Sequence, residues 1–427
     1  MAFANKGAAP PNCSLIPVLF SPTLSKAIML IVYTSIMQKP DKVDHSILLN
    51  KLKSYGVTEK YIKWIQCFLT NRFQTVHNNG FHSYTTPVMS GVPQGSVLGP
   101  LLFIIYINDL QSVISGARMF TFADDTKLVS KISSMDDALC LQINLDLVIK
   151  WSKRNNMELN INKFEYINHK SITHNNNLNM LDNLPFSKKN FNYSVSNSFE
   201  ICKTPSVRDL GVTVDEELNW KLHIEKVTKS CRQLCGWILS IFHTRDKTTM
   251  LTIFNSLVIS KLDYCCEIWN PYQIQQIIKI EQIQRAFTSR IAGLKEDNYW
   301  NRLKKLEIMS LQRRREKIIL IHVWKILNKL YPNSINLEFK LHTRTNSTKA
   351  IIKPLPKIRG RILTGFDMSF TIRAAKLWNI LPANLTNVSS LNSFKAGLAK
   401  FLTKIPDQPP LPGYPYKCDN SLINTCA

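Results

Sequence analysis

Two short blocks of sequence, close together in the chain, constrain its fold more than any other feature. The first, Phe122-Ala123-Asp124-Asp125, sets adjacent carboxylates between the apolar runs 119–122 and 127–129. Asp is common in turns, so this block alone predicts only a tight β-hairpin. Two aspartates at the tip of a hairpin can also point at one site, because the turn breaks the alternation of the strand. Converging carboxylates are what paired divalent cations need for phosphoryl transfer.

The second block, residues 90–103, reads Ser-Gly-Val-Pro-Gln-Gly-Ser-Val-Leu-Gly-Pro-Leu-Leu-Phe. Its glycines allow the backbone to come close to a ligand, and Pro93 restricts the loop. Gln94, followed by Gly95, offers a hydrogen-bond donor and an acceptor to a base edge or a sugar. A helix is expected to begin near Pro100, because proline is favoured in a first turn. No purely structural explanation covers both blocks together.

The two blocks resemble the reverse transcriptases of non-LTR retrotransposons, in particular the jockey-like LINE group. The resemblance implies an α+β fold, in which a right-hand polymerase palm with a ferredoxin-like core precedes a helical thumb and a helical C-terminal region. It implies template-directed transfer of a deoxynucleotide to a primer 3′-hydroxyl. Asp124 and Asp125 would then hold Mg²⁺ or Mn²⁺, and the partners would be an RNA template, a DNA primer and deoxynucleotide triphosphates.

The resemblance also assigns roles to residues outside the aspartate pair. Facing the nucleotide and template would be Pro93, Gln94, Gly95 and Phe122. Lys163, in the run Leu-Asn-Ile-Asn-Lys, would lie near the phosphates as a proton donor to pyrophosphate, although spacing alone favours a surface lysine. The run Asp209-Leu210-Gly211 would form the hairpin that grips the primer end.

The chain departs from the family pattern before Asp41. The pattern there is an apolar strand ending in Asp, three residues, then Ala-Phe-Asp and Val-Asp-His. Reading back from Asp41, the metal-binding position is Ser35, the alanine position is Lys39, and the aromatic position that screens the sugar is Pro40. A serine hydroxyl cannot supply an anionic bridging ligand. We therefore expect unrelated sequence in place of the strand, a chain truncated relative to the family before Asp41, without its endonuclease and fingers, and an enzyme that is inactive or weak.

Composition agrees with a nucleic-acid partner. The chain carries 54 Lys and Arg against 30 Asp and Glu, a formal net charge of +24. Such an excess favours polyphosphates or an acidic membrane surface, without choosing between them. The apolar run 97–107 is too short and too interrupted for a membrane span, and the first residues lack a signal-peptide pattern. We therefore expect a nuclear or cytoplasmic protein.

Periodicity and composition divide the chain into five expected parts. They are an unrecognised segment 1–40, a palm 41–215, a helical thumb and connection 216–335, a C-terminal region 336–405, and a proline-rich tail 406–427 that is extended or disordered. Within the palm we expect a helix capped by Asp41, with Asp44 in its first turn. We expect a second helix over 136–151, with an apolar stripe of Leu139, Ile143, Leu147 and Trp151. Later helices are expected at 220–242, 250–262, 274–291 and 311–330.

The basic run Arg313, Arg314 and Arg315 has two interpretations. It is either a solvated helix face or a contact to nucleic-acid phosphates. The function also has alternatives: a reverse-transcriptase-domain protein with an impaired catalytic site, a non-catalytic RNA- or DNA-binding protein, or a helical interaction protein whose charge is incidental.

Overall fold

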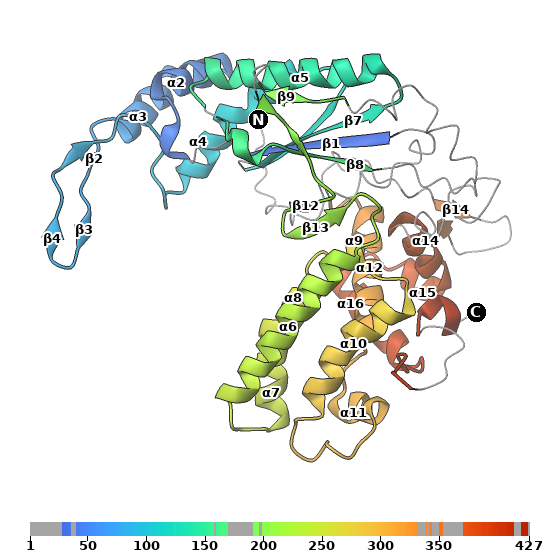
Figure 1. Cartoon of the computed structure of the whole chain (residues 1–427). Helices are drawn as coiled ribbons and strands as arrows, with labels where there is room; N and C mark the ends of the chain where they lie inside the picture. The colour runs from blue at the N-terminus through green and yellow to red at the C-terminus, as the bar shows by residue number, and fades with distance from the viewer. Residues whose placement is uncertain are drawn as a thin grey trace. The chain divides into compact units, whose positions relative to one another are not determined.

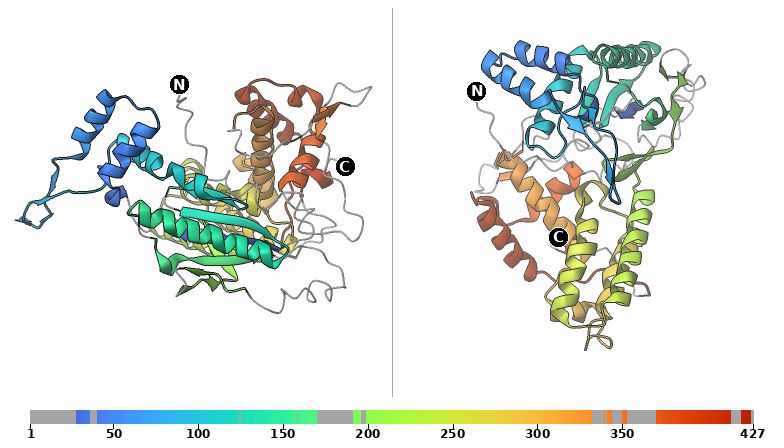
Figure 2. Two further views of the ribbon diagram at one scale, coloured as in Figure 1. Left: turned by 90° about the horizontal axis from the view of Figure 1, so that it is seen from above. Right: turned by 90° about the vertical axis from the view of Figure 1, so that its left-hand side faces the viewer.

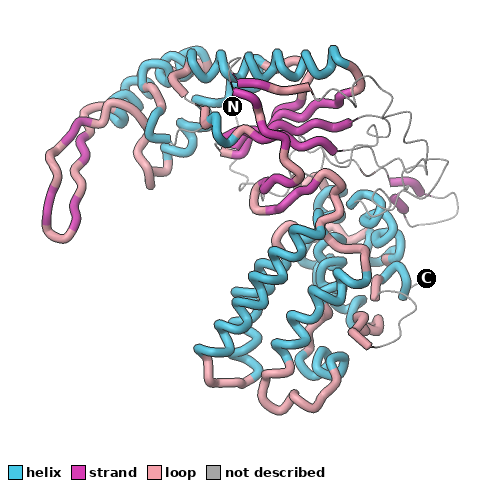
Figure 3. The backbone as a smooth tube through the Cα atoms, viewed as in Figure 1, coloured by secondary structure: helices cyan, strands magenta, loops and turns pink. Residues whose placement is uncertain are grey.

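The structure is a computed structural model that describes residues 28–35, 40–123, 125–157, 159–169, 191–195, 199–331, 339, 341–343, 350–352, 370–413 and 420–425. The chain divides into two compact units, each taken by itself below. The sheet unit comprises Leu24–Ser171 and Asn175–Val207. The helical unit comprises Arg208–Ala427, to which two short pieces from the N-terminal half of the chain are also assigned. One unit mixes strands with helices and the other is almost entirely helical, so the predicted α+β class is confirmed (Figure 3).

A five-stranded sheet forms the centre of the sheet unit, in the spatial order β11-β8-β1-β7-β6 (Figure 1). Its strands are β1 (Ile28–Ser35), β6 (Arg118–Phe122), β7 (Asp125–Ile132), β8 (Glu165–His169) and β11 (Cys202–Lys203). β1 runs antiparallel to both of its neighbours, β7 and β8, while β11 joins β8 in parallel. The two edges of β1 are therefore both used in backbone pairing.

Strand β1 was not predicted from the sequence. The segment Ile28–Ser35 reads Ile-Met-Leu-Ile-Val-Tyr-Thr-Ser, and it occupies the place where we expected the palm strand to have been lost. Val32 is fully buried. The first five residues, Ile28–Val32, form a continuous apolar run without alternation, so a search for a period of two overlooks the strand. The strand is thus retained as a structural element, although its last residue is a serine.

The sheet unit also contains the helices α2 (His45–Ser54), α3 (Glu59–Leu69), α4 (Leu98–Ile107) and α5 (Met135–Arg154). Helix α5 lies along the sheet and contacts β7 (Figure 1). The apolar stripe expected on α5 was wrong in phase: Leu139 and Ile143 are exposed. Its buried face is instead formed by Leu141, Leu145, Val148 and Ile149, together with Trp151 from the expected stripe. Both sets of residues are apolar, and the sequence alone does not say which set faces the sheet.

The first helix after the expected junction begins one turn later than its predicted cap. Asp44, not Asp41, is the N-cap of α2, and its carboxylate accepts hydrogen bonds from the backbone N–H groups of Ser46 and Ile47. Between α3 and α4 a two-stranded ribbon projects from the unit, with its tip at Asn79 and Gly80 (Figures 1 and 2). The ribbon consists of β2 (Phe73–Gln74), β3 (His77–Asn78), β4 (Phe81–His82) and β5 (Thr86–Pro87).

The helical unit is organised around α12, which packs against α9, α10, α14 and α16. Its main helices are α6 (Lys221–Ile241), α7 (Lys247–Phe254), α8 (Ser260–Asp263), α9 (Cys266–Trp269), α10 (Ile274–Thr288), α11 (Tyr299–Leu306), α12 (Leu311–Leu327), α14 (Phe370–Ile380), α15 (Ala383–Thr386), α16 (Leu391–Thr403) and α17 (Leu422–Thr425). A turn of π-helix, Asn255–Ile259, joins α7 to α8, so the helix expected over 250–262 is continuous. Among the described residues, no helix is both long enough and apolar enough to cross a membrane.

The arginine run at the start of α12 does not form a surface. Arg313 and Arg315 are only 1% and 2% exposed. Arg313 donates hydrogen bonds to the carbonyl oxygens of Pro406 and Asn420, and Arg315 donates to the side chain of Asn270. Neither can meet a phosphate in this conformation, so both interpretations of the run, a solvated face and a phosphate contact, were wrong for these two residues. Their burial follows from the central place of α12 in the unit.

Arg314 differs from its two neighbours. It is partly exposed and forms a two-pronged ion pair with Asp263, with Nη2 lying 2.7 Å from Oδ2. The charge of its guanidinium is therefore already paired with a carboxylate of the same unit.

The proline-rich segment after α16 is also more ordered than expected. Asp407 accepts hydrogen bonds from the backbone N–H and the hydroxyl of Ser310, the N-cap of α12. Trp300 donates its indole N–H to the carbonyl of Pro409, and Leu411 is buried. Residues 406–413 thus pack on α11 and α12, so this part of the tail is held in place by hydrogen bonds and is not disordered.

A buried carboxylate lies beside the arginines of α12. Glu281 is 1% exposed and accepts hydrogen bonds from the hydroxyl of Tyr299 and the backbone N–H of Leu311. Burial raises the pKa of Glu281 to about 7, although the Tyr299 hydrogen bond and the nearby Arg315 oppose the shift. Because the folded-state pKa lies above the unfolded value, the stabilisation is full in acid and is lost as pH rises towards 7.

We expect Glu281→Gln to remove this pH dependence. Between pH 5 and 8 the free energy of unfolding of the wild type should fall relative to the variant by on the order of 3 kcal/mol. Urea titrations at several pH values measure the difference. Glu296→Gln, which neutralises an exposed carboxylate of the same unit, is the matched control and should follow the wild type. A constant difference between Glu281→Gln and wild type across this range would contradict the assignment.

The arginine run gives a second prediction. Arg313→Gln and Arg315→Gln each leave buried polar partners unpaired and should lower the free energy of unfolding by about 3 kcal/mol. Arg314→Gln breaks a partly exposed ion pair and should cost less than about 1 kcal/mol. Denaturant unfolding of the three single variants measures the order. Equal effects at all three positions would mean that the run forms one common face.

Candidate functional site

The hairpin predicted around the aspartate pair is present. β6 and β7 pair antiparallel, with Phe122 opposite Asp125. Only two residues, Ala123 and Asp124, connect them, and Ala123 has the left-handed φ of 52° that such a tight turn needs. Asp124 lies outside the described residues, so its position stays a prediction. Asp125 is exposed at the start of β7.

Ser35 lies beside Asp125 in the sheet. It is the last residue of β1, and the register places it directly opposite Asp125. Paired residues in an antiparallel ladder have Cα atoms roughly 5 Å apart. The position that the family pattern reserves for a metal-binding carboxylate is therefore next to Asp125 in space, and in this chain a serine occupies it.

Lys163 lies at the same end of the sheet, on the other side of β1. It ends the short 3-10 turn η5 (Ile161–Lys163), which contacts β1 and leads into β8. The register of β1 with β8 ends at the pair Tyr33 and Glu165. Continuing that register by two residues would bring Lys163 level with Ser35. Asp125 at the start of β7, Ser35 at the end of β1 and the turn η5 that carries Lys163 therefore lie at the same end of the sheet.

The loop that contains Pro93, Gln94 and Gly95 is fixed on the turn before α2. The Gly91 N–H donates to the Val43 carbonyl at 2.8 Å, and the Arg72 guanidinium donates to the Gly91 carbonyl at 2.7 Å. A Cβ atom on Gly91 would lie 2.4 Å from the carbonyl oxygen of Asp41, and the φ of 85° at this position also requires glycine. Close backbone approach, not contact with a ligand, accounts for this glycine.

Gln94 is hydrogen-bonded to the turn before α2, on which the loop is fixed. Its side-chain amide donates to the carboxylate of Asp41 at 2.7 Å. Asp41 is thus an orienting residue for Gln94, and the amide oxygen remains the group directed elsewhere. Gly95 follows with a φ of 76° and open space where a side chain would stand. Phe122 is 46% exposed, so its ring is available to a neighbour at the hairpin.

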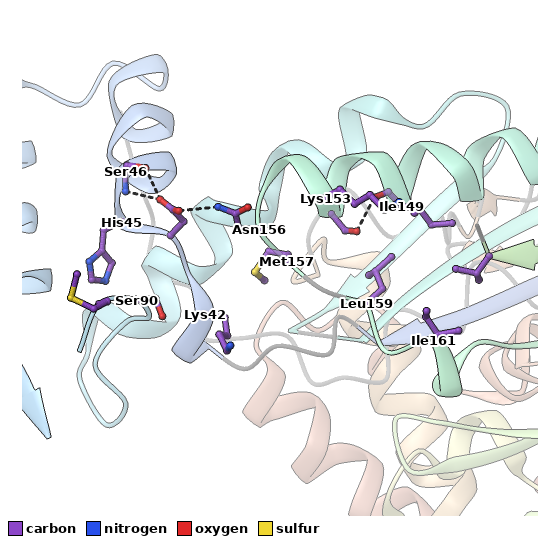
Figure 4. Close-up of a pocket in the computed structure, with 14 residues that line it drawn as sticks. Lys42, His45, Ser46, Ser90, Ile149, Lys153, Asn156, Met157, Leu159 and Ile161 are labelled. Atoms are coloured by element: carbon purple, nitrogen blue, oxygen red, sulfur yellow. Dashed lines mark hydrogen bonds between the residues drawn. The ribbon is translucent and has the colours of Figure 1, made fainter. Parts of the chain in front are cut away.

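A cavity of about 790 Å³ opens beside this loop (Figure 4). Its walls come from the turn before α2, the residues before Gly91, the C-terminal end of α5 and the segment that leads to η5. The lining residues that carry polar or charged groups are Lys42, Asp44, His45, Ser46, Ser90, Ser152, Lys153 and Asn156. Ile161 of η5 also lines it, which connects the cavity to the turn that ends in Lys163.

The carboxylate in this cavity has a structural role. Asp44 caps α2 and also accepts a hydrogen bond from the side-chain amide of Asn156 at 3.0 Å. The Ser46 hydroxyl is the largest cause that holds the pKa of Asp44 below its ordinary value. His45 is hydrogen-bonded to the Gly91 carbonyl. The exposed cations at the cavity are then Lys42 and Lys153, and sequence patterns pointed to neither.

The second predicted hairpin is also present. β12 (Ser206–Asp209) and β13 (Val212–Asp215) pair across the two-residue loop Leu210-Gly211, both with positive φ. The hydroxyl of Tyr264 donates to the Leu210 carbonyl and holds the loop within the helical unit. Asp209 is buried, which makes it a support of the hairpin more readily than a direct ligand contact.

By the family pattern, the third metal-binding position at the aspartate hairpin is Ser35. The carboxylates available at the sheet edge are Asp125 and, by sequence, Asp124, while the third position carries a hydroxyl. Within the described part of the chain, no group of three or more His, Cys, Asp or Glu side chains could hold a metal ion. Two hard divalent cations require several anionic oxygen ligands, and a neutral serine is a poor substitute.

The sequence therefore identified both hairpins and the loop, and the structure brings Asp125, Ser35 and Lys163 to the same end of the sheet. Arg313 and Arg315 are removed from the candidate site by burial. Asp41 and the cavity at Asn156 were missed as site features. The run Asn155-Asn156, with a left-handed φ of 49° at Asn156, was the available sequence signal for a sharp turn there.

Comparison with known proteins agrees with this geometry. Residues 39–214 match the family described as reverse transcriptase (RNA-dependent DNA polymerase). The RNA-directed DNA polymerase from mobile element jockey of Drosophila melanogaster is 26% identical over 274 residues, covering 61% of this chain and 28% of the relative. The probable RNA-directed DNA polymerase from transposon X-element, also from Drosophila melanogaster, is 24% identical over 270 residues with the same coverage. This chain thus spans little more than a quarter of the length of these relatives.

A solved structure, apo telomerase from Candida tropicalis, covers 72% of this chain and 52% of its own chain at 9% identity and a TM-score of 0.34. That likeness is too weak to bear on the site. The family match covers the sheet unit from just before Asp41, with both hairpins and the loop of Gln94 inside it. Residues 39–214 are therefore similar to the reverse transcriptase domains of non-LTR mobile elements such as jockey.

Proposed function

We propose that this protein binds nucleic acid through a reverse transcriptase domain, is an RNA-directed DNA polymerase by descent, and is impaired in the catalytic step. The observation that carries the proposal is the register of β1, which sets Ser35 opposite Asp125. Family membership of residues 39–214 supplies the ancestral reaction. The third carboxylate of that reaction's metal site has no counterpart at the end of β1.

The chemistry explains why this position matters. In nucleotidyl transfer the primer 3′-hydroxyl attacks the α-phosphorus, pyrophosphate leaves, and negative charge builds on the reacting phosphate. Mg²⁺ or Mn²⁺ held between carboxylates would stabilise that charge. Ser35 offers one neutral oxygen where an anionic ligand is needed, so Asp124 and Asp125 would hold divalent metal weakly. Removal of one stabilising group of this kind costs roughly a hundredfold to a thousandfold in rate.

Binding places weaker demands on the site than catalysis. Gln94, held by Asp41, would present its amide oxygen to a base or sugar, with Pro93, Gly95 and Phe122 beside it. Lys163 would face the phosphates of a nucleotide, and the hairpin Asp209-Leu210-Gly211 would meet a primer end. The expected partners are an RNA template, a DNA primer and deoxynucleotide triphosphates, in the nucleus or the cytoplasm.

We expect no primer extension by the purified protein above that of the double variant Asp124→Asn, Asp125→Asn, in either Mg²⁺ or Mn²⁺. The reason is the incomplete donor set at the sheet edge. Extension of a labelled DNA primer on an RNA template measures it, and electrophoretic mobility of the same primer–template reports binding in parallel. Extension that the double variant abolishes would contradict the impaired site and favour an active enzyme. Absence of binding would instead favour an interaction protein with no nucleic-acid role.

The donor argument has a test that does not depend on activity. Ser35→Asp adds a carboxylate opposite Asp125 and should tighten Mn²⁺ binding at the hairpin by about tenfold or more. Ser35→Asn, which has a similar shape without the charge, should leave the affinity unchanged. Titration followed by paramagnetic resonance measures both, and Asp125→Asn in the Ser35→Asp background should remove the gain. An equal affinity for Ser35→Asp and Ser35→Asn would show that position 35 does not face the metal.

A further inference from the structure

The helical unit contains a cavity of about 850 Å³ that is distinct from the site described above. It lies among α6, α10 and the segment that leads into α11. Its floor is partly apolar, with Leu239, Phe287 and Leu411 among the lining residues. Its remaining lining is strongly basic and is made of Arg232, Arg285, Arg290, Lys295 and Arg302.

The positive charge of this cavity is not balanced by the chain. Asp297 is the one carboxylate that lines it, and both oxygens of that carboxylate accept hydrogen bonds from Lys305 Nζ at 2.8 Å. Lys305 itself is not among the lining residues. Within the described residues, none of the five lining cations forms an ion pair. The cavity therefore has a surplus of positive charge that an external anion would neutralise.

Arg302 fixes the inner end of the cavity. Its side chain is 5% exposed and donates to the carbonyls of Asp297 at 2.6 Å and Arg285 at 3.0 Å, and to the hydroxyl of Thr288 at 3.2 Å. Burial is the main cause that lowers the pKa of Arg302, and the like charge of Arg285 adds to the shift. The Arg302 guanidinium is thus held by two backbone carbonyls and one hydroxyl, and the charge of Arg285 lies near enough to act on it.

The other cations have more freedom. Arg290 and Lys295 are exposed, and Arg285 is half-buried near the end of α10. Arg232 projects from α6 and donates to the side chain of Gln282 at 3.3 Å. Exposed guanidinium and ammonium groups around a fixed inner arginine match the several acceptor oxygens of phosphate groups, which arginine binds in a two-pronged fashion.

We propose that this cavity binds the sugar–phosphate backbone of a nucleic-acid strand. Its volume exceeds what one phosphate needs, since a water molecule takes about 30 Å³ of liquid. The apolar floor suits a sugar or a base beside the phosphates. The inference rests on the proposed function for the identity of the polyanion, and it moves the phosphate contact from the buried arginines of α12 to this cavity.

The test compares two triple variants that remove the same charge. The cavity variant is Arg285→Gln, Arg290→Gln, Lys295→Gln. The control variant is Lys229→Gln, Lys304→Gln, Lys400→Gln, three exposed lysines of the same unit that do not line the cavity. Anisotropy of a labelled RNA hairpin, without divalent metal or nucleotide, gives the affinity between about 50 and 200 mM KCl.

We expect the cavity variant to bind at least about tenfold more weakly at low salt and to lose about 2 from the log–log salt slope, because each phosphate contact contributes roughly 0.7 to 0.9. The control variant should change the slope by much less, and two unrelated RNA sequences should respond alike. Equal losses in both variants would overturn the inference, since they would show a general charge effect. The single variant Lys295→Gln, at an exposed position, should also weaken RNA binding, but by less than the triple variant.

A second measurement separates the source of the phosphate. Tripolyphosphate should raise the thermal unfolding temperature of the wild type and of the control variant, and should raise that of the cavity variant less. If the cavity variant loses this response while RNA binding is unchanged, the cavity binds a free polyphosphate and the nucleic-acid proposal is wrong. If the wild type binds no RNA at all, the proposed function fails, and this outcome differs from equal losses in the two triple variants.

Discussion

The pairing of β1 with both β7 and β8 is the interaction on which the sheet unit depends. A central strand satisfies backbone groups on two sides at once, and without it β7 and β8 would each leave a buried edge unpaired. This requirement fixes the backbone and the apolar character of the strand, but it says nothing of the side chain at its end. The pairing therefore accommodates Ser35 at the end of the strand. Fold and catalysis impose different demands on the same strand.

How far the sequence predicts this architecture depends on how local each signal is. The hairpin at Asp125 carries its own turn chemistry and was predicted correctly, while the ligand contacts of the Gln94 loop stay a prediction. Strand β1 shows no alternation of apolar and polar residues, so only its pairing with β7 and β8 reveals it. The stripe on α5 failed for a related reason. Two apolar faces compete on that helix, and the choice between them is made by the sheet and not by the helix.

The arginines of α12 show the same limit for charge. Three consecutive basic residues at the start of a helix suggest an exposed face when read alone. In the structure this turn lies at the centre of the helical unit, where Asn270 and the carbonyls of the C-terminal segment accept the arginine hydrogen bonds. The proline-rich segment is ordered by this same network, through Asp407 and Ser310. A sequence run gives the number of charges, but only packing decides whether they bind the chain itself or an external ligand.

A cavity with surplus positive charge is harder to predict from sequence, because the basic residues that line it come from separate helices. Arg232 and Arg302 are 70 residues apart in the chain and meet only through the packing of α6 against α10 and α11. Rigid helices can keep such cations together without any metal or reacting group. Phosphate binding by this cavity therefore would not require the accuracy that a metal site requires at the end of β1. A change of one carboxylate at the end of β1 leaves this group of cations unchanged, because the two features lie on separate elements of the chain.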